Sequence, residues 1–97
     1  MNLSDVEWPS LWEVCTDRVL VEELQREVSL NHVLCNQEVN VIARRTDCDD
    51  VLFQEINRKY FALVHLTWSS KSENPPWPFT KIFVTFNEFA AENFDEQ

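Results

Sequence analysis

The densest group of chemically active side chains in the sequence lies at residues 44–50, RRTDCDD. Two guanidinium groups, Arg44 and Arg45, stand beside the carboxyl groups of Asp47, Asp49 and Asp50. Neighbouring carboxyl groups can bind hard cations, and an arginine can hold a carboxylate or phosphate through two parallel hydrogen bonds. The same residue types also form ordinary turns and internal ion pairs. The segment therefore predicts either a turn stabilised by Arg–Asp pairs or a site for a ligand or partner.

Cys48 and His65 are a candidate nucleophile and base, with a nearby aspartate to orient the imidazole. The carboxylates around Cys48 weaken this hypothesis, because negative charge raises the pKa of a thiol and lowers its nucleophilicity. His65 lies among apolar residues, where a hydrogen-bonded structural histidine is the usual outcome. We therefore assign no catalytic residue, and an enzyme is the less favoured class.

Metal and cofactor sites find little support. The D-x-D-D run lacks the longer ligand series and the Gly of a calcium loop. His32 and Cys35 have the spacing of half a zinc site, but a second close pair is missing. The chain contains no glycine, which excludes Gly-rich phosphate loops and dinucleotide-binding motifs. We expect no metal and no cofactor.

Trp68, Trp77 and Phe79 frame a segment, residues 69–78, that contains three prolines and is predicted to be a loop. Exposed tryptophans give a large contact area at low ordering cost, so these residues could form a recognition surface. Such a loop can also fold back and cover a sheet with its own aromatic side chains. Both interpretations stay open at the level of sequence.

Three strands are predicted around the charged segment, at residues 38–44, 51–56 and 60–68. In the first strand, Val39, Val41 and Ala43 alternate with more polar neighbours. The third strand is apolar on both faces, which is typical of a central or doubly covered strand. The connection at residues 57–59 is short enough for a hairpin, so the second and third strands are expected to be antiparallel neighbours.

Helices are predicted before and after these strands in the sequence. The capping box Ser10-x-x-Glu13 predicts a short helix at residues 10–15, and the apolar pattern predicts a second helix at residues 17–31. Residues 79–86 fit either a strand or a helix. The capping box Thr85-x-x-Glu88 favours a short strand followed by a helix at residues 86–94.

These elements predict one α+β domain over residues 1–97. We expect N-terminal helices, a three- to four-stranded antiparallel meander and a C-terminal helix that covers one face. The length suits a single hydrophobic core, and 44% hydrophobic residues argue against disorder.

The formal net charge of −9 repels phosphate backbones and anionic lipids, so we expect neither nucleic acid nor membrane as a partner. A basic protein surface would instead be attracted. Three cysteines, Cys15, Cys35 and Cys48, cannot all pair within one chain, and the first residues do not resemble a secretory signal. We expect a cytoplasmic protein.

Several segments together resemble a set of short bacterial proteins for which no activity is established. They are EL..E at residues 23–27, VNVIARRTDCDDVLF at 39–53, VHLTWS at 64–69, WP at 77–78 and the pair Phe86 and Phe89. This resemblance covers about two thirds of the chain. In size and acidity the chain is also similar to immunity proteins, which neutralise bacterial toxins. The resemblance implies no catalytic residue.

The sequence thus favours a small acidic protein-binding module, an antagonist or immunity-type protein that masks a basic surface on another protein. Its expected contacts combine acidic residues for attraction with tryptophans as anchors: Asp47, Asp49, Asp50, Trp68 and Trp77. The alternative is a small enzyme or small-ligand binder that uses Arg44, Arg45 and His65 with the same aspartates. A homodimer formed through an edge strand is a third alternative.

Overall fold

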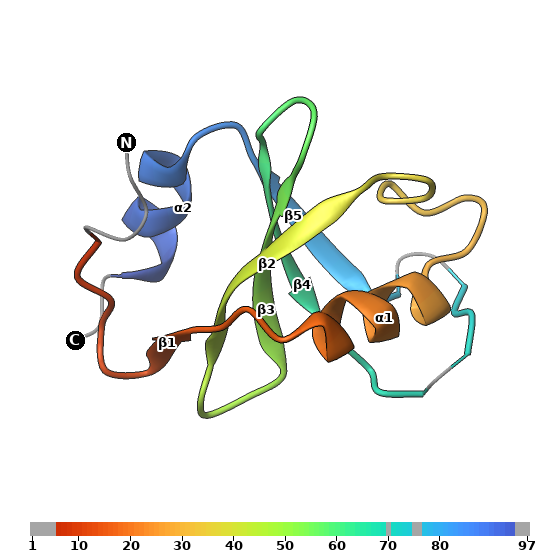
Figure 1. Cartoon of the computed structure of the whole chain (residues 1–97), viewed down its shortest axis with the longest axis horizontal. Helices are drawn as coiled ribbons and strands as arrows, with labels where there is room; N and C mark the ends of the chain where they lie inside the picture. Colours follow the sequence, from red (N-terminus) through yellow and green to blue (C-terminus); the bar gives the residue numbers. More distant parts are fainter. Residues whose placement is uncertain (1–5, 70, 75–76, 95–97) are drawn as a thin grey trace.

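The computed structural model describes residues 6–69, 71–74 and 77–94, and these build one antiparallel sheet of five strands (Figure 1). The strands lie in the sheet in chain order, β1-β2-β3-β4-β5. Their bounds are β1 Trp12–Val14, β2 Val39–Arg45, β3 Asp50–Glu55, β4 Phe61–His65 and β5 Phe79–Phe83. The two helices are α1 (Arg18–Glu27) and α2 (Phe86–Asn93).

This architecture corrects the predicted α+β class. The chain is mostly β, with five strands in place of three to four, and a single helix precedes the meander. The predicted helix at residues 10–15 is wrong, because Trp12, Glu13 and Val14 pair with Arg45, Arg44 and Ala43 as an edge strand. The Trp12 side chain is buried among the aromatic residues of α2. Burial of this large side chain outweighs the local capping signal.

Helix α1 begins where the sequence predicts, since Asp17 caps it by accepting a hydrogen bond from the Val19 N–H at 3.0 Å. The helix ends at Glu27, four residues earlier than predicted, and Val28 is already extended. Its buried apolar residues Leu20, Val21 and Leu24 pack on one face of the sheet. That packing supplies most of the stability of so short a helix.

Strand β2 changes faces midway. Val41 pairs with Phe53 and Ala43 with Leu52, so Ile42 is an extra residue in the ladder, a β-bulge. Val39 and Val41 therefore face α1, whereas Ala43 faces the α2 side. The predicted common face of Val39, Val41 and Ala43 is wrong for this reason. The bulge also decides on which side the two following arginines lie.

Both faces of the sheet carry a core. The α1 face buries mainly aliphatic side chains, and the α2 face buries mainly aromatic ones. Strand β4 lies between β3 and β5, with Ala62 and Val64 on the first face and Phe61 on the second. This position confirms the prediction of a doubly covered strand. Figure 1 shows the two helices at opposite ends of the twisted sheet.

Some of the segments that connect the strands and helices have the structure that the sequence predicts. The β3–β4 hairpin forms as predicted, with Lys59 in a left-handed conformation at φ 68°. The uncertain segment at 79–86 divides into strand β5 and the N-terminal cap of α2, where Thr85 and Glu88 form the predicted capping box. Residues 70, 75 and 76 of the predicted 69–78 loop lie outside the described residues.

Candidate functional site

The two arginines of the 44–50 segment bind acidic side chains of their own chain. Arg45 donates through Nε and Nη2 to the two carboxylate oxygens of Asp47, each at 2.8 Å, and its guanidinium lies 5.8 Å from the Trp12 ring centre. Arg44 lies 3.4 Å from the Glu13 carboxylate across the β1–β2 ladder. The Arg45 hydrogen bond lowers the pKa of Asp47 and raises that of Arg45. The arrangement therefore agrees with the turn-and-ion-pair interpretation of this segment.

Cys48 and His65 have separate surroundings. His65 Nδ1 lies 2.7 Å from Asp50 Oδ1, and these two residues are cross-strand neighbours. Partial burial, then the charges of Asp50 and Asp47, raise the pKa of the Cys48 thiol. The cavity beside Cys48 measures only about 30 Å³, and His65 does not line it. A nucleophile and base do not converge on a substrate-sized space here.

His32 is part of the structure rather than a free ligand. Its Nδ1 accepts the Leu34 N–H at 3.0 Å, and its Nε2 lies 2.8 Å from the Pro78 carbonyl. These two contacts tie residues 32–34 to the residue that precedes β5. Across the described part of the chain, no three His, Cys, Asp or Glu side chains are grouped to hold a metal ion.

Trp68 combines exposure with a fixed backbone. Its side chain is 43% exposed, and the residue has φ 58°, a left-handed conformation that is costly for a bulky residue. The backbone N–H groups of Thr67 and Trp68 donate to the two carboxylate oxygens of Glu27, at 2.9 and 2.8 Å. Glu27 thus holds Trp68 in position from α1.

The surface next to Trp68 carries one exposed carboxylate, that of Asp49. One shallow depression has an acidic, basic and apolar lining: Leu20, Arg44, Arg45, Cys48, Asp49, Asp50, Val51 and Trp68. The Asp49 side chain is exposed and makes no ion pair with the described residues. The structure therefore brings three of the predicted contact residues, Trp68, Asp49 and Asp50, to one place. Asp47 and Asp50 are occupied by Arg45 and His65.

Glu27 itself belongs to a buried acidic pair. Glu23 and Glu27 stand one turn apart on α1, and both side chains are 0% exposed. Burial, followed by a hydrogen bond with Glu23, raises the pKa of the Glu27 carboxyl. Arg26 partly neutralises the pair, because its guanidinium donates to Glu23 Oε1 at 2.9 and 3.2 Å. Sequence analysis missed this pair, since both glutamates read as members of a solvated helix face.

Trp77 and Phe79 form a separate aromatic group. Their rings are 5.7 Å apart in an edge-to-face arrangement, and they are 44% and 55% exposed. Both side chains remain in contact with solvent, which favours the interpretation as a recognition surface over that of a closed cover. Phe79 pairs with His65 across β4 and β5, so this group lies at the same end of the sheet as Trp68.

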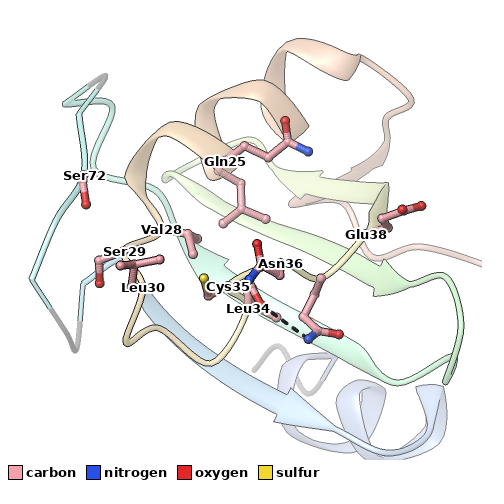
Figure 2. A pocket seen from close by; sticks show the side chains of 11 residues that line it. Gln25, Val28, Ser29, Leu30, Leu34, Cys35, Asn36, Glu38 and Ser72 are labelled. Carbon is pink, nitrogen blue, oxygen red and sulfur yellow. Dashed lines mark hydrogen bonds between the residues drawn. The ribbon is translucent and has the colours of Figure 1, made fainter.

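A larger cleft, of about 490 Å³, lies between α1 and the segment that leads into β2 (Figure 2). Its lining combines apolar and polar side chains: Leu24, Gln25, Val28, Ser29, Leu30, Leu34, Cys35, Asn36, Gln37, Glu38 and Ser72. Sequence analysis did not identify this site. Its residues come from a helix end, an irregular connection and a distant loop, so no local pattern marks them.

Comparison of the chain with protein-family models, curated proteins and solved structures finds no match. The resemblance to short bacterial proteins therefore stays a prediction. No helix in the described residues has the length and apolar character needed to cross a membrane.

Proposed function

We propose that this chain is a protein-binding module whose partner presents a basic surface, with Trp68 as the anchor and Asp49 as the carboxylate that meets the partner's charge. The observation that carries the proposal is the half-exposed indole of Trp68 on a strained backbone held by Glu27. Strained backbone in a folded protein is concentrated at functional sites. A tryptophan fixed before binding also loses little entropy when a partner contacts it.

Charge supports the choice of partner. The net charge is −9, and internal ion pairs engage four of the cationic side chains: Arg26, Arg44, Arg45 and Lys81. Exposed acids such as Glu22 and Glu38 make no ion pair with the described residues. The surface field is therefore negative, which accelerates encounter with basic proteins and disfavours nucleic acid. An antagonist that masks a basic site is the activity most consistent with this charge.

The enzyme alternative has weaker support. Arg44 and Arg45 are engaged by Glu13 and Asp47, and the cavity at their loop is far smaller than ordinary substrate pockets. The proposal also places the protein in the cytoplasm, because Cys15, Cys35 and Cys48 are free thiols that a reducing compartment preserves.

Photo-crosslinking from the proposed surface tests this function. A photoreactive phenylalanine derivative replaces Cys48, which leaves Trp68 and Asp49 intact, and the labelled protein is irradiated in lysate of the source organism. We expect crosslinks to proteins of basic isoelectric point, with a yield that falls as salt rises from about 50 to about 300 mM. Trp68→Ala and Asp49→Asn, each in the Cys48-labelled background, should reduce the yield.

The matched control carries the same photoreactive residue at Arg58, in the hairpin at the opposite end of β4. Identical crosslinked products from positions 48 and 58 would show that the contact is non-specific. A yield unaffected by Trp68→Ala would remove Trp68 from the proposal. Thermal unfolding of each variant confirms that the comparison is made between folded proteins.

A further inference from the structure

The cleft beside α1 has an apolar floor and a polar rim. Leu24 and Leu34 are buried and Val28 is half-buried, and they form its apolar part. Figure 2 shows the amide of Gln25 and the carboxylate of Glu38 at one end, and Ser29, Leu30 and Ser72 at the other. A volume of about 490 Å³ lies within the range of sites that hold small molecules or single large side chains.

The electrostatics of the cleft favour a cation. Glu38 supplies a full negative charge, and the lining contains no Lys, Arg or His. Helix α1 ends at Glu27, so the partial negative charge of its C-terminus lies beside Val28 and Ser29. The amide oxygens of Gln25 and Asn36 add further acceptors. An anion would be repelled by the Glu38 carboxylate and by the C-terminus of α1.

The cleft also contains an unsatisfied polar group. The Ser29 hydroxyl oxygen is buried and has no hydrogen-bond partner among the described residues. A buried hydroxyl without a partner costs roughly 1–3 kcal/mol. The Ser29 oxygen is closed to solvent, so the electrostatic preference of the cleft rests on Glu38 and the C-terminus of α1.

We propose that this cleft takes the side chain of an arginine from the basic partner. Its guanidinium offers five N–H donors in one plane, which suits a carboxylate and amide oxygens spread along a rim better than the compact ammonium of lysine does. Its methylene groups would pack on Leu24, Val28 and Leu34. The inference rests on the proposed function, because it assigns to the same partner a second contact, at the C-terminal end of α1.

The test uses N-acetyl-arginine N-methylamide as the probe and follows amide signals by NMR. We expect saturable shifts of the side-chain amides of Gln25, Asn36 and Gln37, with a dissociation constant of about 1–10 mM. Glu38→Gln should weaken binding about tenfold, since a charge-assisted hydrogen bond is lost. Glu22→Gln is the matched control: Glu22 is an exposed acid on α1 that does not line the cleft, and its loss should leave binding within about twofold.

The corresponding norleucine and lysine derivatives separate the contribution of the apolar side chain from the contributions of the positive charge and of the guanidinium group. Equal binding of the norleucine derivative would overturn the proposal, because the cleft would then select only apolar bulk. Equal binding of the lysine derivative would overturn the assignment of a guanidinium. An equal loss in Glu38→Gln and Glu22→Gln, or no shift at the cleft amides, would also overturn it. These outcomes are independent of crosslinking from position 48, so either proposal can fail alone.

Discussion

Glu27 is the residue that connects α1 to the candidate surface, and its protonation gives the protein a characteristic pH dependence. Burial and the hydrogen bond with Glu23 raise its pKa in the folded state above the ordinary value of 4.5. The folded state therefore binds this proton more tightly than the unfolded state does. The resulting stabilisation is fully present below pH 4.5 and is lost as the pH rises through the folded pKa.

Glu27→Gln should remove the loss of stability that occurs as the pH rises through the folded pKa of Glu27. We expect the free energy of unfolding of the variant to change less than that of the parent between about pH 4 and about pH 8 in urea titrations. The amide nitrogen cannot accept a hydrogen bond, so either Thr67 or Trp68 loses its acceptor, at a cost of about 1–3 kcal/mol. Glu22→Gln, on the exposed face of α1, serves as the control. A variant that keeps the parental slope would show that Glu27 does not titrate in this range.

Asp47 affects the pH dependence of stability in the opposite direction to Glu27. Its pKa is lowered from 3.8 by Arg45, so its contribution is present above that value and is lost as the pH falls through the folded pKa. The parent protein should therefore lose stability on both sides of a mildly acidic optimum. Because Asp47 is exposed, its part of the profile should weaken with added salt, whereas the part from buried Glu27 should persist.

Cys48 is exposed, and its surroundings predict a weakly reactive thiol. Its pKa lies above the ordinary value of 9.0, first because of partial burial and then because of Asp50 and Asp47. We expect iodoacetamide to alkylate Cys48 more slowly than free cysteine near pH 8, as measured by mass spectrometry of the Cys48 peptide. Asp50→Asn should accelerate the reaction about two- to threefold. Asp49 is not among the main causes of the shift, so Asp49→Asn should accelerate the reaction less than Asp50→Asn does.

At the scale of elements, local patterns predicted the central strands well. Residues 51–56 and 60–68 carry enough apolar residues to specify their faces, and β3 and β4 lie there with the expected pairing. The charges of the 44–50 segment were also evident from composition. Which acid binds which arginine was not, since Glu13 reaches Arg44 only through the β1–β2 ladder.

The features that the sequence predicted wrongly or did not predict have one physical cause: tertiary packing outweighs the local sequence pattern. Strand β1 has three residues, too few for a periodic signal, and depends on Trp12 inserting beside Phe89, 5.3 Å between ring centres. The bulge at Ile42 reverses the face of Ala43 without any glycine to mark it. Glu23 and Glu27 look solvated in sequence, yet the loop at Thr67 and Trp68 covers Glu27.

Trp12→Ala tests the assignment of β1 as a strand. Removing this buried indole should lower the free energy of unfolding by about 3–5 kcal/mol, measured by urea titration. It should also accelerate exchange of the Cys15 and Thr46 amides, which bond across β1 and β2. Glu13→Ala should cost no more than about 1 kcal/mol, since its ion pair with Arg44 is exposed. Similar effects of the two substitutions would favour the capping-box helix instead.

At the scale of the whole molecule, the net charge and the edge strands of the sheet determine whether two copies of the chain associate. Strand β5 ends the sheet on one side, and Phe79, Ile82 and Val84 on or next to it are exposed. An edge-strand homodimer would use this side. Lys81 projects from the middle of the strand, and a charged side chain on an edge opposes pairing with a second copy. The net charge of −9 adds repulsion between copies.

Lys81→Val should therefore promote self-association. It removes the edge charge, leaves Glu92 without its ion-pair partner and extends the exposed apolar strip of β5. We expect the weight-average mass from sedimentation equilibrium to rise with concentration for this variant, and to rise further at about 0.5 M salt, where repulsion between acidic copies is screened. Arg58→Val, which removes one positive charge from the β3–β4 hairpin, is the control and should sediment like the parent. If the parent itself sediments as a dimer at low salt and Lys81→Val leaves that mass unchanged, β5 pairing is not limited by Lys81, and the homodimer becomes the better description of this protein.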